Sequence, residues 1–259
     1  MNPELKTAIQ ITQAVNKLLM NKFKRSGNNN IKFKKHAEIV TNADLSANKY
    51  ITNKLLKYFP DYDIVSEEAK KIDNPGTKTW YIDPLDGTTN FAYGFLEFAT
   101  CLSLQNKKET LLGTIGLPPA QEIYYAEKNK GAWCNGKKIK VSTTNNLENS
   151  MFLLCTGHSP LGKNRYQKLL QKLDITKLRF RFFAAAGVEL SAVASGKADA
   201  AILSKIHPWD VLSGVLLVRE AGGKVTNWQG KEWQITDDNL IASNGKLHNK
   251  ILKFTKDIK

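Results

Sequence analysis

Residues 80–91 read Trp-Tyr-Ile-Asp-Pro-Leu-Asp-Gly-Thr-Thr-Asn-Phe, an apolar run that passes into two acidic residues and a Gly-Thr-Thr turn. The three residues before Asp83 are aromatic or β-branched, as is typical of a buried strand. Because Pro84 has no backbone N–H to donate to a neighbouring strand, we expect this strand to end at Asp83. The strand would then deliver acidic side chains to one edge of a sheet.

Asp83 and Asp86 flank the proline, so a tight turn brings both carboxylates into one small volume. Like charges this close repel unless a cation lies between them, and hard divalent ions such as Mg2+ prefer oxygen ligands. Gly87 to Thr89 follow as a predicted helix start, where unpaired backbone N–H groups favour an anion such as phosphate. The stretch therefore predicts a metal and phosphate site, although taken alone it is also typical of a strand-ending turn.

The composition is that of a globular protein. A chain of 259 residues with 42% hydrophobic content is long enough for one large or two closely packed domains. It shows neither an apolar run near ~18 residues nor a signal-peptide pattern, so we expect a cytoplasmic protein with no membrane partner. Cys101, Cys134 and Cys155 lie far apart, which predicts reduced thiols rather than disulfides.

The formal net charge of +14 is compatible with nucleic acid, a membrane surface or an acidic small substrate as partner. Lysines are scattered singly and arginine is scarce. This distribution favours a solvated basic surface over a nucleic-acid-binding tract, so no nucleic-acid partner is expected.

The first part of the chain predicts helices and short strands. An amphipathic helix covers residues 3–23, and residues 24–36 form a loop or a loosely held hairpin. A short strand over residues 38–44 then turns into a second helix that stops near Pro60. Asp44 lies at the start of that helix, where an acid can compensate the helix dipole or belong to a site.

Another strand over residues 63–66 ends at the acidic residue Glu67, and a charged loop is predicted over residues 69–78. Strand ends converge at one edge of a sheet. Glu67 can therefore join Asp83 and Asp86, although as a surface acid it would be unremarkable.

From residue 97 to residue 136 the pattern is an antiparallel meander, with a hairpin turn at Asn135-Gly136. After a polar link the sequence alternates strands and helices, which indicates an α/β arrangement. One of these helices begins at Pro208 and carries Asp210 in its first turn, as a helix cap or as a ligand. We expect an N-terminal α+β lobe over residues 1–142 and a C-terminal α/β lobe over residues 143–259.

Taken together, Glu67-Glu68, the run from Asp83 to Phe91, and Trp209-Asp210 followed by Glu220-Ala-Gly-Gly resemble the inositol monophosphatase family. Members of this family are Mg2+-dependent, lithium-sensitive phosphatases of inositol and sugar phosphates. The resemblance implies a layered α/β/α/β/α sandwich, often as a homodimer. It also implies that a metal-activated water hydrolyses a small phosphomonoester.

The resemblance implies two to three Mg2+ ions. Glu67 and Asp83, with the Leu85 carbonyl, would hold one ion. Asp83, Asp86 and Asp210 would hold a second, and a third, weaker ion would lie near Glu67. Asp83 bridges the first two ions, so its loss should abolish activity.

The same resemblance assigns the catalytic and phosphate-binding groups. Glu67 and Thr88, the latter oriented by Asp44, would take the proton from the attacking water. The backbone N–H groups of Gly87 and Thr88 would bind the phosphate. A phosphomonoester dianion repels hydroxide, so the bridging ions make a side-chain nucleophile unnecessary.

The chain departs from the family pattern on the substrate side. By the resemblance, five positions would meet the substrate: Asp210, Ala184, Ala185, Ala186 and Leu203. Family members carry Gly then Ser or Thr at the alanine motif, and often a glutamate in place of Leu203. A site without these polar partners discriminates poorly for inositol hydroxyls.

The substrate therefore stays open between inositol monophosphate or a related small sugar phosphate and the family's other substrates. These belong to fructose-1,6-bisphosphatases, 3′-phosphoadenosine nucleotide phosphatases and NADP phosphatases. Arg179, Arg181 and Lys205 could meet a second phosphate or be solvated strand-edge cations. Outside the family, the alternatives are a polyanion-binding protein with a vestigial site and a metal-dependent nuclease.

Overall fold

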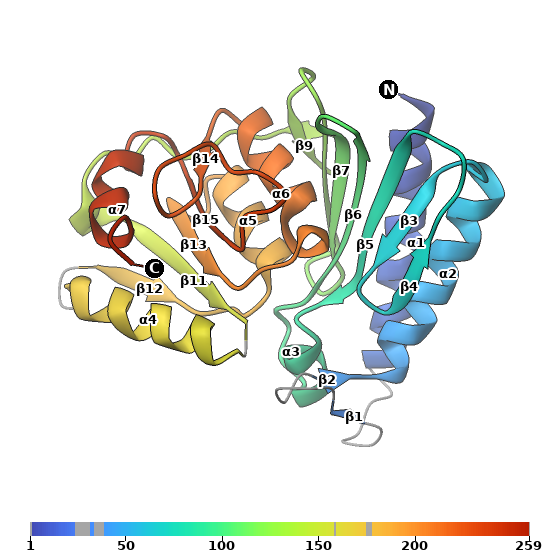
Figure 1. The fold of residues 1–259 in the computed structure, drawn as a ribbon, viewed down its shortest axis with the longest axis horizontal. Coiled ribbons are helices and arrows are strands. Elements are labelled where there is room, and N and C mark those ends of the chain that lie inside the picture. The colour runs from blue at the N-terminus through green and yellow to red at the C-terminus, as the bar shows by residue number, and fades with distance from the viewer. Residues whose placement is uncertain (1, 24–31, 34–38, 158, 175–177, 259) are drawn as a thin grey trace.

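The computed structural model describes residues 2–23, 32–33, 39–157, 159–174 and 178–258. These residues form five layers, in the order helices, sheet, helices, sheet, helices (Figure 1). Separate apolar clusters fill the spaces between the layers. The predicted α/β/α/β/α sandwich is confirmed.

The first layer consists of α1 (Pro3–Phe23) and α2 (Asn42–Tyr58), which cover one face of the larger sheet (Figure 1). Their apolar faces pack with Trp80 and other sheet residues in one buried cluster. The predicted helix over residues 3–23 is confirmed. The predicted loop over residues 24–36 lies outside the described residues except for β1 (Lys32–Phe33), which pairs with β2 (Ile39–Val40).

The larger sheet has eight strands among the described residues, in the order β10-β9-β8-β7-β6-β5-β3-β4. All neighbours are antiparallel except β3 and β5, which run parallel. The strands are β3 (Asp63–Ser66), β4 (Ala69–Ile72), β5 (Lys78–Asp86), β6 (Ala99–Asn106), β7 (Thr110–Leu117), β8 (Glu122–Glu127), β9 (Ala132–Cys134) and β10 (Lys137–Lys138). The predicted hairpin at Asn135-Gly136 is confirmed, since both residues have the positive φ that this turn requires and join β9 to β10.

Two predictions about this sheet are wrong. Residues 69–78 are not a loop throughout, because β4 pairs with β3 as an edge strand. Its charged lysines fit an edge strand, where they discourage pairing with another chain. The strand β5 does not end at Asp83 but continues to Asp86 through a β-bulge, so the proline occupies a position where no ladder N–H is needed.

The middle layer contains α5 (Ala186–Ala194) and α6 (Pro208–Glu220), which lie between the two sheets (Figure 1). Their side chains share one apolar cluster with both sheets. Eight consecutive residues of α6, from Val211 to Val218, are buried. The helix is thus packed on all sides beyond its first turn, and that first turn carries Asp210.

The smaller sheet has the order β12-β11-β13-β15-β14 among the described residues. Its strands are β11 (Met151–Thr156), β12 (Arg179–Arg181), β13 (Ala200–Ser204), β14 (Lys224–Thr226) and β15 (Asn239–Ser243). The helices α4 (Pro160–Lys172) and α7 (His248–Thr255) form the last layer and pack around Phe152 and Trp228. A short 3-10 helix, Leu147–Asn149, precedes β11.

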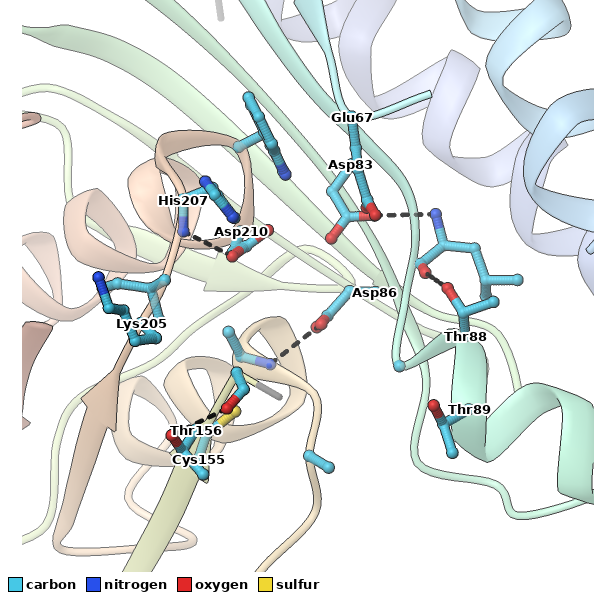
Figure 2. A pocket seen from close by; sticks show the side chains of 17 residues that line it. Glu67, Asp83, Asp86, Thr88, Thr89, Cys155, Thr156, Lys205, His207 and Asp210 are labelled. Atoms are coloured by element: carbon cyan, nitrogen blue, oxygen red, sulfur yellow. Dashed lines mark hydrogen bonds between the residues drawn. The ribbon is translucent and has the colours of Figure 1, made fainter. Parts of the chain in front are cut away.

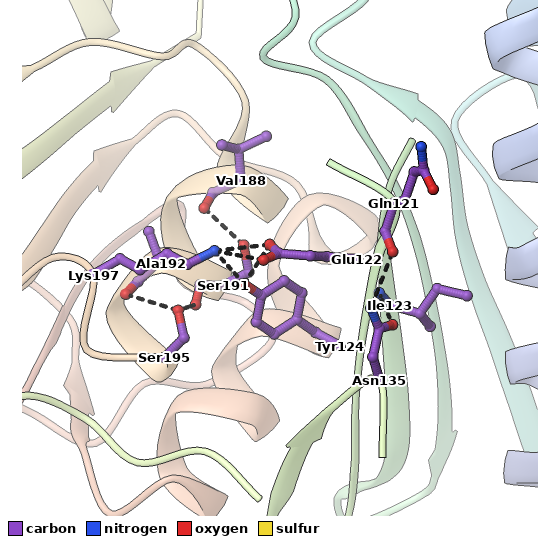
Figure 3. A network of polar contacts seen from close by, with 10 residues as sticks. All are labelled: Gln121, Glu122, Ile123, Tyr124, Asn135, Val188, Ser191, Ala192, Ser195 and Lys197. Atoms are coloured by element: carbon purple, nitrogen blue, oxygen red, sulfur yellow. Dashed lines mark hydrogen bonds and ion pairs between the residues drawn. The ribbon is translucent and has the colours of Figure 1, made fainter. Parts of the chain in front are cut away.

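Polar contacts also join the larger sheet to the segment that follows α5 (Figure 3). Lys197, which follows α5, donates to both carboxylate oxygens of Glu122 at 2.8 Å and to the Tyr124 hydroxyl at 3.0 Å. Each sheet lies wholly on one side of residue 142, and the division into lobes there stays a prediction. In the described part of the chain, every helix is too short or too polar to cross a bilayer.

Candidate metal and phosphate site

Three carboxylates from distant parts of the chain meet at one edge of the larger sheet. Because β3 and β5 are parallel, Glu67 follows β3 beside the end of β5, and its N–H donates to the Ile82 carbonyl at 3.2 Å. One oxygen each of Glu67, Asp83 and Asp210 lies within 4.8 Å of the others. Figure 2 shows these side chains directed into the same space. The structure thus brings together three of the four predicted acidic metal ligands.

The start of α6 fixes the position of Asp210. The His207 N–H donates to Asp210 Oδ2 at 2.7 Å, so one carboxylate oxygen caps the helix. The sequence left a helix cap and a ligand as alternatives for this residue. In the structure the capping contact holds the side chain at the shared carboxylate group.

Asp86 faces the same cavity but is not part of the three-carboxylate group. Its Oδ1 and Oδ2 accept from the N–H groups of Ala186 and Gly187, at 3.1 and 2.6 Å. Burial raises the pKa of Asp86 to about 7, against the lowering effect of these two hydrogen bonds. Asp86 therefore links the acidic edge of the sheet to the start of α5, and its predicted role as a metal ligand stays a prediction.

The acidic group carries strong electrostatic strain. Asp83 is only 2% exposed. Burial and then the neighbouring carboxylates, Glu67 first among them, raise the pKa of Asp83 well above its ordinary value. Oxygen donors that repel one another in a buried space fit a hard divalent cation such as Mg2+. The Leu85 carbonyl, whose residue also lines the cavity, could add a neutral oxygen ligand.

Thr88 and Asp44 are in direct contact. The Thr88 hydroxyl lies 2.9 Å from Asp44 Oδ1 and 2.9 Å from the Leu85 carbonyl oxygen, and it can donate to one of them at a time. Asp44 Oδ2 accepts from the N–H and hydroxyl of Thr41, which caps α2. Burial raises the pKa of Asp44 despite these hydrogen bonds. Asp44 is therefore both a first-turn acid of its helix and the partner of Thr88.

Gly87 forms the turn between β5 and α3 (Thr88–Tyr93). Its φ is +81°, and a Cβ added there would lie 2.7 Å from the Glu97 carbonyl oxygen. A glycine is required on both grounds. The turn thus brings its backbone close to the segment around Glu97, and the phosphate-binding role of Gly87 and Thr88 stays a prediction.

The cavity beside the carboxylates has a volume of about 380 Å3. Its far wall includes Ala184 and Ala186, both predicted as substrate contacts. In the part of the chain that the structure describes, Ala185 and Leu203 do not line it and are fully buried. Any influence of these two residues on a substrate is therefore exerted through their neighbours.

Lys205 lines the cavity, whereas Arg179 and Arg181 are not among its described lining residues. The ammonium of Lys205 lies 2.8 Å from Asp238 Oδ2, and Arg165 donates to the other oxygen of Asp238 at 2.9 Å. Burial acts to raise the pKa of Asp238, but the two cations outweigh it and lower the value to about 2. The cluster therefore keeps one net positive charge beside the cavity.

Sequence reasoning missed several lining residues. Cys155, Thr156 and Gly157 come from the end of β11, and His207 stacks on Trp209 with 4.8 Å between ring centroids. The carboxyl end of a strand was a usable signal for the first three, because β3 and β5 end at the same cavity. The stacking of His207 on Trp209 could not be predicted, because the sequence shows only two aromatic rings near Asp210.

Comparison with known proteins finds similarity to phosphatases over nearly the whole chain. A model of the inositol monophosphatase family matches residues 1–259. The chain is 34% identical to a Thermotoga maritima protein named fructose-1,6-bisphosphatase/inositol-1-monophosphatase, over 85% of this chain and 84% of that protein. It is 33% identical to an inositol-1-monophosphatase of Caulobacter vibrioides, over 84% and 87%. The solved extragenic suppressor protein suhB of Bartonella henselae is 29% identical and superposes with a TM-score of 0.93 over 99% of both chains.

Proposed function

Since this chain belongs to the inositol monophosphatase family and is a phosphoric monoester hydrolase, we propose that it hydrolyses inositol monophosphate or a related small sugar phosphate with Mg2+ as its cofactor. The observation that carries the proposal is the convergence of Glu67, Asp83 and Asp210 within 4.8 Å. Carboxylates this close fit a divalent cation better than any other occupant.

Glu67, Asp83 and Asp210 would hold the metal, with the Leu85 carbonyl and Asp86 completing two to three sites. Bound there, Mg2+ neutralises the phosphate charge and lowers the pKa of the attacking water. The capping box at the start of α6 and the bulge in β5 position Asp210, Asp83 and Asp86 at this site. The substrate phosphate would lie beside Gly87 and Thr88, which line the same cavity as the carboxylates.

Thr88 and Asp44 would orient the attacking water and receive its proton together with Glu67. The hydroxyl of Thr88 can accept a hydrogen bond from water while its own hydrogen points to Asp44. The raised pKa of Asp44 makes it a stronger proton acceptor than an exposed aspartate. The backbone N–H groups of Gly87 and Thr88 would then bind the phosphate oxygens.

A second candidate substrate carries another anionic group far from the scissile phosphate. The observation that favours it is Lys205, a cation that lines the same cavity as Ala184 and Ala186. The relative from Thermotoga maritima is named for fructose-1,6-bisphosphate as well as inositol 1-phosphate. Fructose 1,6-bisphosphate, a 3′-phosphoadenosine nucleotide and NADP belong in the same substrate panel.

The test is phosphate release from that panel, with Mg2+ titrated into metal-free protein. We expect phosphate release to require Mg2+ and to be inhibited by lithium. We also expect the protein to be a homodimer located in the cytoplasm. Release that persists in excess chelator would contradict the metal mechanism. Cleavage of phosphodiesters without cleavage of any monoester would replace the proposal with a nuclease.

A further inference from the structure

Glu189 is a buried acid that the proposed chemistry does not use. It lies in the first turn of α5 and is 0% exposed. Its side chain turns back along the chain, where Oε1 accepts from the Phe183 N–H at 3.2 Å. The carboxyl group therefore anchors the segment that precedes α5 rather than only compensating the helix dipole.

The segment over residues 183–187 is fastened to the other half of the chain as well. Asn90 Nδ2 donates to the Phe183 carbonyl at 2.5 Å and to the Glu97 carbonyl at 2.6 Å. Asp86 accepts from the N–H groups at the far end of the segment. Phe183 is thus held from both sides: Glu189 accepts from its N–H, and Asn90 donates to its carbonyl.

The next residue, Ala184, has a strained backbone. Its φ is +52°, a left-handed conformation that is unfavourable for alanine because of its Cβ. Ala184 also lines the cavity. Such a conformation persists only where the surroundings enforce it, and functional sites are where it occurs most often. The contact of Glu189 with the adjacent residue is such an enforcing contact.

The environment of Glu189 favours its neutral form. Among the described residues its Oε2 has no hydrogen-bond partner, and an ionised oxygen in that position would be costly. Burial raises the pKa of Glu189 well above its ordinary value. A neutral carboxylic acid and a carboxamide have nearly the same shape, so glutamine is a close substitute here.

We propose that Glu189 is a positioning residue, which holds Ala184 in its left-handed conformation and thereby sets the substrate wall at a fixed distance from the metal carboxylates. The inference rests on the proposed phosphatase site and adds a residue that touches neither substrate nor metal. It predicts that Glu189 acts on substrate affinity more than on metal affinity. Glu67, Asp83 and Asp210 lie on other segments, and Asp86 is bonded to Ala186 and Gly187 in the first turn of α5 rather than to Phe183 or Ala184.

The experiment compares E189L with E189Q on the best substrate of the panel. We expect E189L to raise KM about tenfold while the Mg2+ concentration for half-maximal activity changes less than about twofold. E189Q should restore KM to within about threefold of the wild-type value. A folded E189L with wild-type KM, or an E189Q variant as impaired as E189L, would overturn the proposal. A wild-type protein that releases no phosphate would instead refute the proposed function.

Two further variants separate positioning from loss of stability. Leu190 is the next residue on α5 and is also fully buried, so L190A weakens the same helix while keeping the hydrogen bond between Glu189 and the Phe183 N–H. We expect L190A to lower the melting temperature and leave KM unchanged; a rise in KM equal to that of E189L would overturn the proposal. In the double variant A184G/E189L, glycine accepts a positive φ without strain. Its KM should therefore be at least about threefold lower than that of E189L. Strictly additive effects of the two changes would contradict the link to Ala184.

Discussion

The hydroxyl of Thr88 lies 2.9 Å from Asp44 Oδ1, although the two residues are 44 positions apart in the chain. Asp44 is held by the start of α2, and Thr88 follows the turn that ends β5. The pair therefore couples the outer helix layer to the edge of the sheet where the carboxylates gather. Asp44 is only 1% exposed, whereas an acid that only caps a helix can stay at the surface.

Removing the Thr88 hydroxyl should impair turnover rather than folding. We expect T88A to lower kcat about 100-fold, the size of a general acid–base contribution, with little change in melting temperature. T88S keeps the hydroxyl and should retain most activity. Steady-state kinetics with circular dichroism on each variant make the measurement, and full activity in T88A would remove Thr88 from the mechanism.

Neutralising Asp83 should have opposite effects on activity and on stability. The repulsion around this buried carboxylate destabilises the metal-free fold, so D83N should raise the melting temperature in chelator while lowering kcat about 100-fold or more. Added Mg2+ should stabilise the wild-type protein and not D83N. D73N changes an exposed acid and serves as the control. A D83N protein that is less stable in chelator and still stabilised by Mg2+ would contradict the shared cation site.

The raised pKa of Asp86 predicts a pH dependence of stability in the absence of metal. Its pKa rises from 3.8 to about 7 on folding, so the folded state binds the proton more tightly. The resulting stabilisation is present at pH 4 and is lost as the pH rises to about 7. His248, whose pKa burial lowers to about 4, acts in the opposite direction, because the unfolded chain binds its proton below about pH 6.5.

The difference between wild type and D86N isolates this effect. In chelator, urea unfolding should show that the wild-type free energy of unfolding falls relative to that of D86N between pH 5 and pH 7 by about 1 kcal/mol or more. A difference that is constant with pH would show that Asp86 does not take up a proton on folding.

Lys205 should determine how well a second anionic group is accepted. Its backbone is left-handed, with φ of +57°, so glycine at this position removes the ammonium without adding backbone strain. We expect K205G to lower kcat/KM for fructose 1,6-bisphosphate about tenfold relative to inositol 1-phosphate, and K205R to preserve the ratio. R179A, which changes an exposed cation outside the described lining, should leave the ratio unchanged. Equal losses on both substrates in K205G would favour a purely structural role.

Hydrophobic periodicity predicted single helices and strands, whereas the layered sandwich was implied by the resemblance to the inositol monophosphatase family. The helix over residues 3–23 and the strands before Glu67 and Asp83 followed from local pattern, and the structure adds that these two strands pair in parallel. The bulge at Pro84 could not be predicted, because a proline normally ends a ladder and only the pairing with β6 shows that it is bypassed. The edge strand β4 was hidden by its lysines, since exposed charge is typical of loops and edge strands alike.

The site was predictable where one segment carries several of its residues. Asp83, Asp86 and Thr88 lie within one short run, and Asp210 follows a distinctive pair of aromatic residues. The positions of Lys205 and Glu189 depended on tertiary contacts with Asp238 and Phe183. The sequence left Lys205 open between a contact for a second phosphate and a solvated cation, and in sequence Glu189 is an ordinary acid in a first helical turn.

The most direct test of the shared carboxylate site is anomalous diffraction from crystals of the protein soaked in Mn2+, which substitutes for Mg2+ at oxygen ligands. The account predicts a peak about 2.0–2.4 Å from oxygens of Glu67, Asp83 and Asp210, and its loss in crystals of D210N. A protein with Mg2+-dependent phosphate release and no peak among these three residues would contradict it.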